Sequence, residues 1–104
     1  MVIDAVSQST GAERKVSVEA ADAGLVLAIS EKEAELARVE VPSDKLLAIL
    51  TDPPAGKQRV VAADAKVLEV EVRRNEVLLA VWKADAAVGR DDLMDAVAAA
   101  LPPE

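Results

Sequence analysis

Carboxylate side chains gather at two places in the chain and are the first candidates for chemistry. One group lies near a predicted hairpin and the other at the start of a predicted helix: Glu31, Glu33 and Glu35, and Asp91, Asp92 and Asp95. Paired carboxylates can transfer protons or hold a hard cation. The spacing lacks the glycine and the distal glutamate of a calcium-binding loop. We therefore interpret both groups as solvated turn and helix-start residues and expect no catalytic residue and no bound metal.

Two residue types that carry much of enzyme chemistry are missing. The chain has no histidine, which removes the usual general base at neutral pH and the commonest metal ligand. It has no cysteine, which removes thiolate nucleophiles and disulfides. The Gly56-Lys57 pair lacks the earlier glycine and the Ser or Thr of a phosphate-binding loop. We expect a protein that is not an enzyme and needs no cofactor.

Cations on or beside the predicted strands of the second half are Lys57, Arg59, Arg73, Arg74 and Lys83. On one sheet face they could follow a nucleic-acid backbone, with Trp82 as the only aromatic available for base stacking. They could equally be surface charges that balance neighbouring glutamates. The net charge of −7 disfavours general binding to phosphates and favours solubility.

The bulk composition indicates one soluble domain spanning residues 1–104, since 52% of the chain is hydrophobic and 30% charged. The core must consist of Ala, Val, Leu and Ile, because there is no Phe or Tyr and one Trp. Heavy use of Ala, Val, Asp and Arg is typical of a GC-rich genome, such as that of an actinobacterium or one of its phages. The lack of cysteine and of a signal-peptide pattern at Met1 favours the cytoplasm.

Hydrophobic periodicity predicts eight strands and two helices. The predicted strands are residues 2–6, 15–20, 25–30, 37–41, 59–62, 66–72, 77–82 and 84–88. We expect the first of them to be an edge strand, and the continuous apolar runs 25–30 and 77–82 to lie side by side. The first helix follows Ser43 as N-cap and ends at Asp52 before two prolines. The second has an apolar face of Leu93, Ala96, Val97, Ala100 and Leu101.

The order of these elements repeats. Residues 25–30 match 77–82 at an offset of 52, and the helix starts match at an offset of 47. We predict an α+β fold with a curved antiparallel sheet, built from ββββα pseudo-repeats at 1–52 and 57–104 joined by a loop at 53–56. Chance similarity of strand–turn–helix segments is the alternative explanation. The tandem order resembles that of the Whirly class of single-stranded-DNA-binding regulators, as an order of elements and not as a sequence motif. That resemblance implies nucleic-acid binding.

Both apolar runs carry residues that face away from the helices. These are Trp82, Leu78 and Ala80 in the second run and Val26 and Ala28 in the first. Trp82 aligns with the polar Ser30, so it is either the largest core residue or an exposed aromatic at an interface. We predict a non-enzymatic regulatory protein that uses these five residues to form a homodimer or to dock on a cellular or host protein. The alternatives are a Whirly-like single-stranded-DNA-binding module and, with carboxylates gathered on one face, an acidic mimic of nucleic acid.

Overall fold

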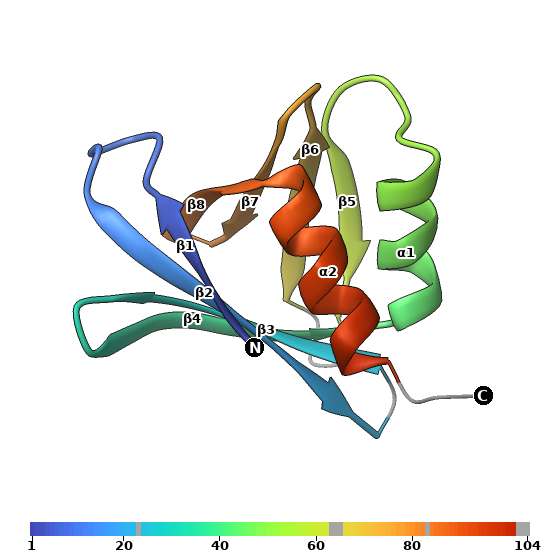
Figure 1. Cartoon of the computed structure of the whole chain (residues 1–104), viewed down its shortest axis with the longest axis horizontal. Coiled ribbons are helices and arrows are strands. Elements are labelled where there is room, and N and C mark those ends of the chain that lie inside the picture. The colour runs from blue at the N-terminus through green and yellow to red at the C-terminus, as the bar shows by residue number, and fades with distance from the viewer. Residues whose placement is uncertain (23, 63–65, 83, 102–104) are drawn as a thin grey trace.

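Alternating apolar and polar residues along the chain produce one sheet with a single buried face. The computed structural model describes residues 1–22, 24–62, 66–82 and 84–101, and within them eight antiparallel strands form a nearly closed sheet with two helices (Figure 1). The first half comprises β1 (Val2–Val6), β2 (Glu13–Ala21), β3 (Gly24–Glu31), β4 (Ala34–Val41) and α1 (Ser43–Thr51). The second half comprises β5 (Gln58–Val61), β6 (Val67–Val72), β7 (Glu76–Val81), β8 (Ala84–Gly89) and α2 (Arg90–Ala100). The predicted α+β class and the two ββββα halves are confirmed.

The strand order β4-β3-β2-β1-β8-β7-β6-β5 places the junction of the two halves in the middle of the sheet. The prediction that Val2–Val6 is an edge strand is wrong, because β1 pairs with β2 on one side and β8 on the other. The β1–β8 junction is short, with only Ala5 opposite Val88 and Val6 opposite Ala87. The strands at the two edges are therefore β4 and β5.

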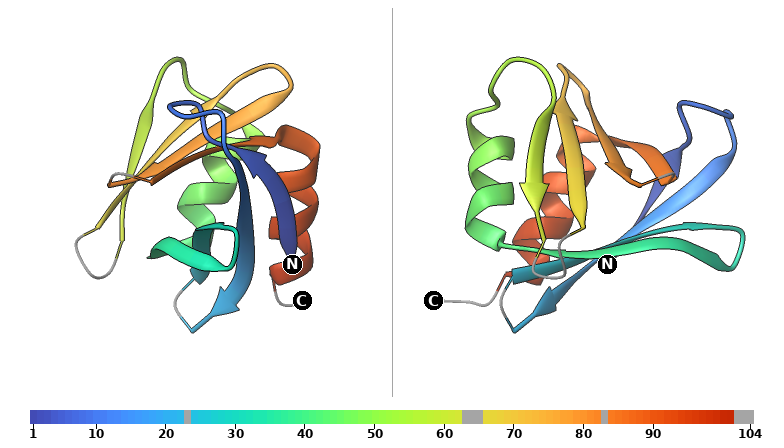
Figure 2. Two further views of the ribbon diagram at one scale, coloured as in Figure 1. Left: turned by 90° about the vertical axis from the view of Figure 1, so that its left-hand side faces the viewer. Right: turned by 180° about the vertical axis from the view of Figure 1, so that it is seen from behind.

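The two continuous apolar strands are not neighbours, contrary to expectation. Strands β2, β1 and β8 lie between β3 and β7 in the sheet order. The four strands of the first half cross those of the second half at a steep angle (Figure 2). Each apolar strand is instead the third strand of its own half, where a neighbouring strand pairs on each side.

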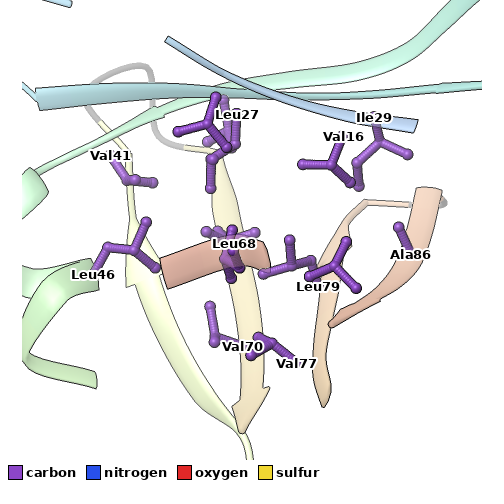
Figure 3. Packing of buried hydrophobic residues seen from close by; sticks show 14 of the residues in the cluster. Val16, Leu27, Ile29, Val41, Leu46, Leu68, Val70, Val77, Leu79 and Ala86 are labelled. Atoms are coloured by element: carbon purple, nitrogen blue, oxygen red, sulfur yellow. The ribbon is translucent and has the colours of Figure 1, made fainter. Parts of the chain in front are cut away.

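The core lies on the inner face of the curved sheet, where side chains from both halves meet (Figure 3). Leu27 and Ile29 of β3 approach Leu68 of β6 and Leu79 of β7, although the two pairs are about 40 to 50 residues apart. The helices add their apolar faces, as Leu46 and Leu50 of α1 and Leu93, Ala96 and Val97 of α2 are buried. The radius of gyration, 12.3 Å, matches the ~13 Å expected of a folded domain of this length.

Some local predictions need correction. Ser43 is not the N-cap of α1: Pro42 holds that position, and no side chain caps the helix. Strand β4 begins at Ala34, three residues before the predicted start at residue 37, because the chain turns within Lys32-Glu33 and pairing with β3 begins at once. Lys83, which the sequence analysis placed among the candidate cations, lies outside the described residues.

Candidate interaction surface

Trp82 is the most exposed large apolar side chain among the described residues, with 90% of its surface accessible to water. It follows β7 as the first residue of a two-residue loop, since Val81 pairs with Ala84 across it. Such short hairpin loops demand a left-handed backbone, which Asn and Gly adopt at low cost. Trp82 adopts it nonetheless, with φ at 57°. A bulky residue in this conformation stores strain.

A cleft opens beside the indole of Trp82. Its volume is about 540 Å³, and it lies where β4 of the first half approaches β6 and β7 of the second. Its aliphatic lining comes from Leu36 and Ala37 on β4, Val81 on β7 and Ala84 on β8, and its cationic lining from Arg14 and Lys66. The size is within the ~300–1,000 Å³ typical of ligand pockets.

A second, smaller hollow of about 330 Å³ shares Lys66, Val81 and Trp82 with the cleft, and its other lining residues include Val67 and Ala80. Trp82 thus lines two neighbouring depressions. Exposed valines extend this surface, because Val67 pairs with Val61 and the two are 37% and 59% accessible. We call Trp82, Leu36, Val61, Val67 and the walls of the cleft the Trp82 surface.

Arg14 forms one wall of the cleft and is fixed by two carboxylates. Its Nε donates to Glu31 at 3.2 Å and its Nη1 to Asp85 Oδ1 at 3.0 Å. Nη1 also donates to the backbone carbonyl of Asp85 at 2.7 Å. The side chain is only 10% exposed. Because β2 carries Arg14 and β8 carries Asp85, these bonds extend the short junction between the halves.

The Asp85 carboxylate is also held by the loop between β1 and β2. Oδ1 accepts hydrogen bonds from the Ser7 and Ser9 hydroxyls at 2.9 and 3.0 Å, and Oδ2 from the Gln8 and Ser9 amides at 2.9 and 3.2 Å. Burial of Asp85 opposes its ionisation, but these hydrogen bonds favour the charged form more strongly and lower its pKa below the usual value. We call Arg14, Glu31, Asp85, Ser7 and Ser9 the Arg14–Asp85 cluster.

Lys66 makes the corresponding contact from the second half. Its Nζ donates to the backbone carbonyl of Arg38 on β4 at 3.0 Å, as Arg14 on β2 donates to that of Asp85 on β8. Arg14 and Lys66 are related by the offset of 52, and Arg38 and Asp85 by the offset of 47. In each half, a cation reaches the last strand of the other half, and both cations line the same cleft.

Similarity to known proteins adds nothing to this geometry. No family model, curated protein or solved structure matches the chain significantly. The similarity to the Whirly class thus stays one of element order. The function is therefore inferred from the geometry of the Trp82 surface.

The five predicted interface residues fall into two separate places. Trp82 is exposed, and Leu78 and Ala80 are half-buried on β7. Val26 is half-buried and Ala28 is buried on β3, which three strands separate from β7 in the sheet order. The structure joins Ala80 to Trp82 through the smaller hollow. On the side of the cleft, the partners of Trp82 are Leu36 and Ala37 of β4, which the sequence analysis did not select.

The predicted nucleic-acid residues do not converge beside Trp82. Arg73 and Arg74 precede β7 and Trp82 follows it, so the length of the strand, ~20 Å, separates them. Arg73 bonds Glu71 at 2.7 Å, and this hydrogen bond and the charge of Glu71 raise the pKa of Arg73. Arg59 lies 3.8 Å from Glu69. Lys57 precedes β5, at the same end of the sheet as Arg73, and Lys83 is outside the described residues.

The carboxylate groups have different surroundings. Glu31 belongs to the Arg14–Asp85 cluster and Glu35 pairs with Arg38 at 2.9 Å, whereas Asp91, Asp92 and Asp95 are exposed on α2. Within the described part of the chain, no three Asp or Glu side chains are grouped so that they could hold a metal ion. In the same residues, neither helix has the length and the apolar character to cross a membrane.

Proposed function

We propose that this protein works as a non-enzymatic interaction protein that binds another polypeptide through the Trp82 surface. The observation that carries the proposal is the indole of Trp82, 90% exposed and held in a left-handed backbone beside an apolar cleft. Exposed tryptophan is unfavourable in water, and Trp is the residue type most enriched among those that dominate binding energy at protein interfaces. At 90% exposure Trp82 contributes little to the core, which supports a role in a contact with a partner.

The surroundings of Trp82 support a protein partner. Interfaces place an apolar anchor at the centre and polar residues at the rim. Here Leu36 and Val67 flank the anchor, and the paired charges of Arg38 and Glu35 lie next to Leu36 along β4. The two depressions that Trp82 lines provide walls against which a partner side chain can pack and exclude water.

Nucleic-acid binding has weaker support. It needs several unpaired cations along one path, with aromatic rings beside them. Arg59 and Arg73 already face glutamates, and Trp82 lies at the other end of β7 from Arg73. The excess of acidic residues adds long-range repulsion of phosphates.

Site-specific photo-crosslinking tests the proposal. A photo-reactive amino acid replaces Trp82 in the cells that produce the protein, and a matched chain carries it at Arg74, an exposed position at the opposite end of β7. We expect a discrete protein adduct from position 82 that position 74 does not give. No protein adduct from position 82, or the same adducts from both positions, would contradict the proposal. An adduct with nucleic acid from position 74 would favour the alternative.

A further inference from the structure

We propose that the partner of the Trp82 surface is a second copy of this chain, with the indole of each copy seated in the cleft of the other. This inference rests on the proposed function and assigns the occupant of the cleft. A two-fold contact uses the same patch twice, so the patch must be complementary to itself. The Trp82 surface meets this condition because an apolar projection and an apolar hollow of about 540 Å³ lie next to each other.

The chemistry of the cleft fits a neutral aromatic occupant. Its aliphatic walls are Leu36, Ala37, Val81 and Ala84. The charge of Arg14 is already matched by Glu31 and Asp85, so an occupant need not bring a carboxylate to neutralise it. An indole ring therefore matches this lining, and Trp82 is the only aromatic residue in the chain.

Lys66 lines both depressions beside Trp82. An indole that enters the cleft of another copy comes within reach of this ammonium group. A cation beside the face of a Trp ring is attracted by the negative charge on that face. The contact with Lys66 fixes the orientation of the incoming indole ring, which the aliphatic walls of the cleft do not do.

The local charge favours contact between two copies at this surface over contact elsewhere. Among the described residues, three cations and three carboxylates line the two depressions or bond to their lining: Arg14, Lys66 and Arg59, with Glu31, Asp85 and Glu69. The surface is thus near neutral on a chain of net charge −7. Two copies that meet through other faces bring excess acidic groups together, which opposes association.

The available area places the contact among small, transient interfaces. Each buried aromatic side chain contributes ~150–250 Å², so the two indoles together supply ~300–500 Å². Leu36, Val61 and Val67 enlarge the patch with their exposed surface. Stable specific interfaces bury ~1,200–2,000 Å² and transient ones less. We therefore expect a reversible dimer with a dissociation constant on the order of 10 µM.

A reciprocal arrangement brings the two indoles together. Trp82 both projects from the surface and lines the cleft, so the incoming ring contacts the resident one in an offset or edge-to-face pair. Because no other aromatic side chain is present, every aromatic optical signal of the protein reports on Trp82. Two interacting indoles give a paired positive and negative band in the far-ultraviolet circular dichroism spectrum that a single indole cannot give.

The experiment is sedimentation velocity of the purified full chain from about 1 µM to about 1 mM, a range that brackets the expected affinity. Circular dichroism and Trp emission are recorded on the same samples. We expect conversion from monomer to dimer, the paired indole band, and a shift of the emission to shorter wavelength, all with the same midpoint.

Two variants test separately the contribution of the projecting indole and that of the cleft. Trp82→Ala removes the indole, and Leu36→Glu places a charge on the wall of the cleft while leaving Trp82 in place. Both residues are substantially exposed, at 90% and 45%, and circular dichroism below 215 nm on the monomers checks that the fold persists. We expect both variants to stay monomeric over the whole range. The matched control Arg74→Glu, which adds charge at the far end of β7, is expected to dimerise, at most a few-fold more weakly than the unmodified chain.

A chain that stays monomeric to about 1 mM overturns the inference, as does a dimer that either variant retains. The photo-crosslinking experiment tests the proposed function independently of this inference. A monomeric protein that still gives a discrete adduct with a different protein from position 82 refutes the self-contact and keeps the proposed function. A monomer without any adduct refutes both.

Discussion

Lys32 corresponds to Trp82 in the hairpins of the two halves, in place of the Ser30 that the offset of 52 predicts, and both residues have a left-handed backbone. Each is the first residue of the two-residue loop that follows the third strand of its half, and the φ angles are 48° and 57°. Neither is the Asn or Gly that such a loop favours. The strained turn is therefore a property of the fold, and the side chain it presents is what differs between the halves.

The surroundings of Lys32 and Trp82 differ in polarity, as their side chains do. The hollow beside Lys32 is lined by three acidic and three basic residues, together with small and apolar ones, whereas the cleft beside Trp82 has a mainly aliphatic lining with two cations. Lys32 thus lies among charged residues, and the indole lies beside apolar walls. This match is the reason to regard Trp82 as part of a surface and not as an isolated exposed residue.

Replacing Trp82 with Asn is expected to stabilise the monomer. A left-handed conformation costs an ordinary residue ~1–2 kcal/mol and costs Asn less, and an indole that is 90% exposed loses few contacts when removed. We expect the free energy of unfolding in urea, measured on dilute protein, to rise by ~0.5–1 kcal/mol. Lys32→Asn is the control and should change it in the same direction. A decrease of more than about 1 kcal/mol for Trp82→Asn would show that the indole supports the fold.

The Arg14–Asp85 cluster should matter far more to stability than a surface ion pair. Asp85→Ala removes the acceptor of four hydrogen bonds and leaves the mostly buried Arg14 with one carboxylate fewer. We expect a loss of ~2–4 kcal/mol in the free energy of unfolding. The comparison is Glu35→Ala, which breaks the exposed Arg38 pair and should cost less than ~0.5 kcal/mol. Equal losses from the two variants would mean that the cluster does not join the halves.

The same cluster predicts a loss of stability in acid. Hydrogen bonds outweigh the effect of burial and keep the pKa of Asp85 below its usual value. A carboxyl group with a lower pKa in the folded state stabilises the fold above its unfolded pKa of ~3.9, and this contribution disappears as the pH falls through the folded pKa. The difference in unfolding free energy between the unmodified chain and Asp85→Asn should be constant from about pH 7 to 5 and shrink below about pH 4. A difference that stays constant down to about pH 2 would contradict this role of Asp85.

Gly24 is expected to tolerate no side chain. It begins β3, and a Cβ at this position would overlap the backbone carbonyl oxygen of Val41 at the end of β4. Neither backbone can move without breaking the register between the two strands. We expect Gly24→Ala to cost more than ~3 kcal/mol by urea unfolding. Gly56→Ala is the control: its φ is +81° but nothing lies within 4 Å of the added Cβ, so we expect a loss of ~1–2 kcal/mol. Similar losses for both variants would argue against the close contact between β3 and β4.

The element order could be predicted from the sequence because periodicity is a local property. Alternation in residues 15–20 and 66–72 indicates strands with one solvent-exposed face, and these residues lie in β2 and, from Val67 on, in β6. Strand neighbours are a non-local property, and the prediction for Val2–Val6 failed for this reason. Nothing within that run indicates that β8, about 80 residues later, pairs with it.

The candidate surface could be predicted only in part. The lone aromatic drew attention to Trp82, but its exposure depends on where the hairpin turns, and the predicted strand 77–82 included the residue that the structure assigns to the loop. Leu36 and Asp85 were not selected, because each becomes important through residues that are far away in sequence. The alternation of Lys15 to Ala20 marked the strand near Arg14 but could not show that its partner is Asp85.

The most direct test of the central claim is the fluorescence of Trp82 at high dilution, where the chain is monomeric. No other aromatic residue contributes to the signal. We expect long-wavelength emission typical of a solvated indole, and quenching by acrylamide almost as efficient as for free tryptophan amide. Short-wavelength emission that acrylamide quenches poorly in the monomer would show that Trp82 is a core residue, and would contradict both the interaction surface and the self-contact built on it.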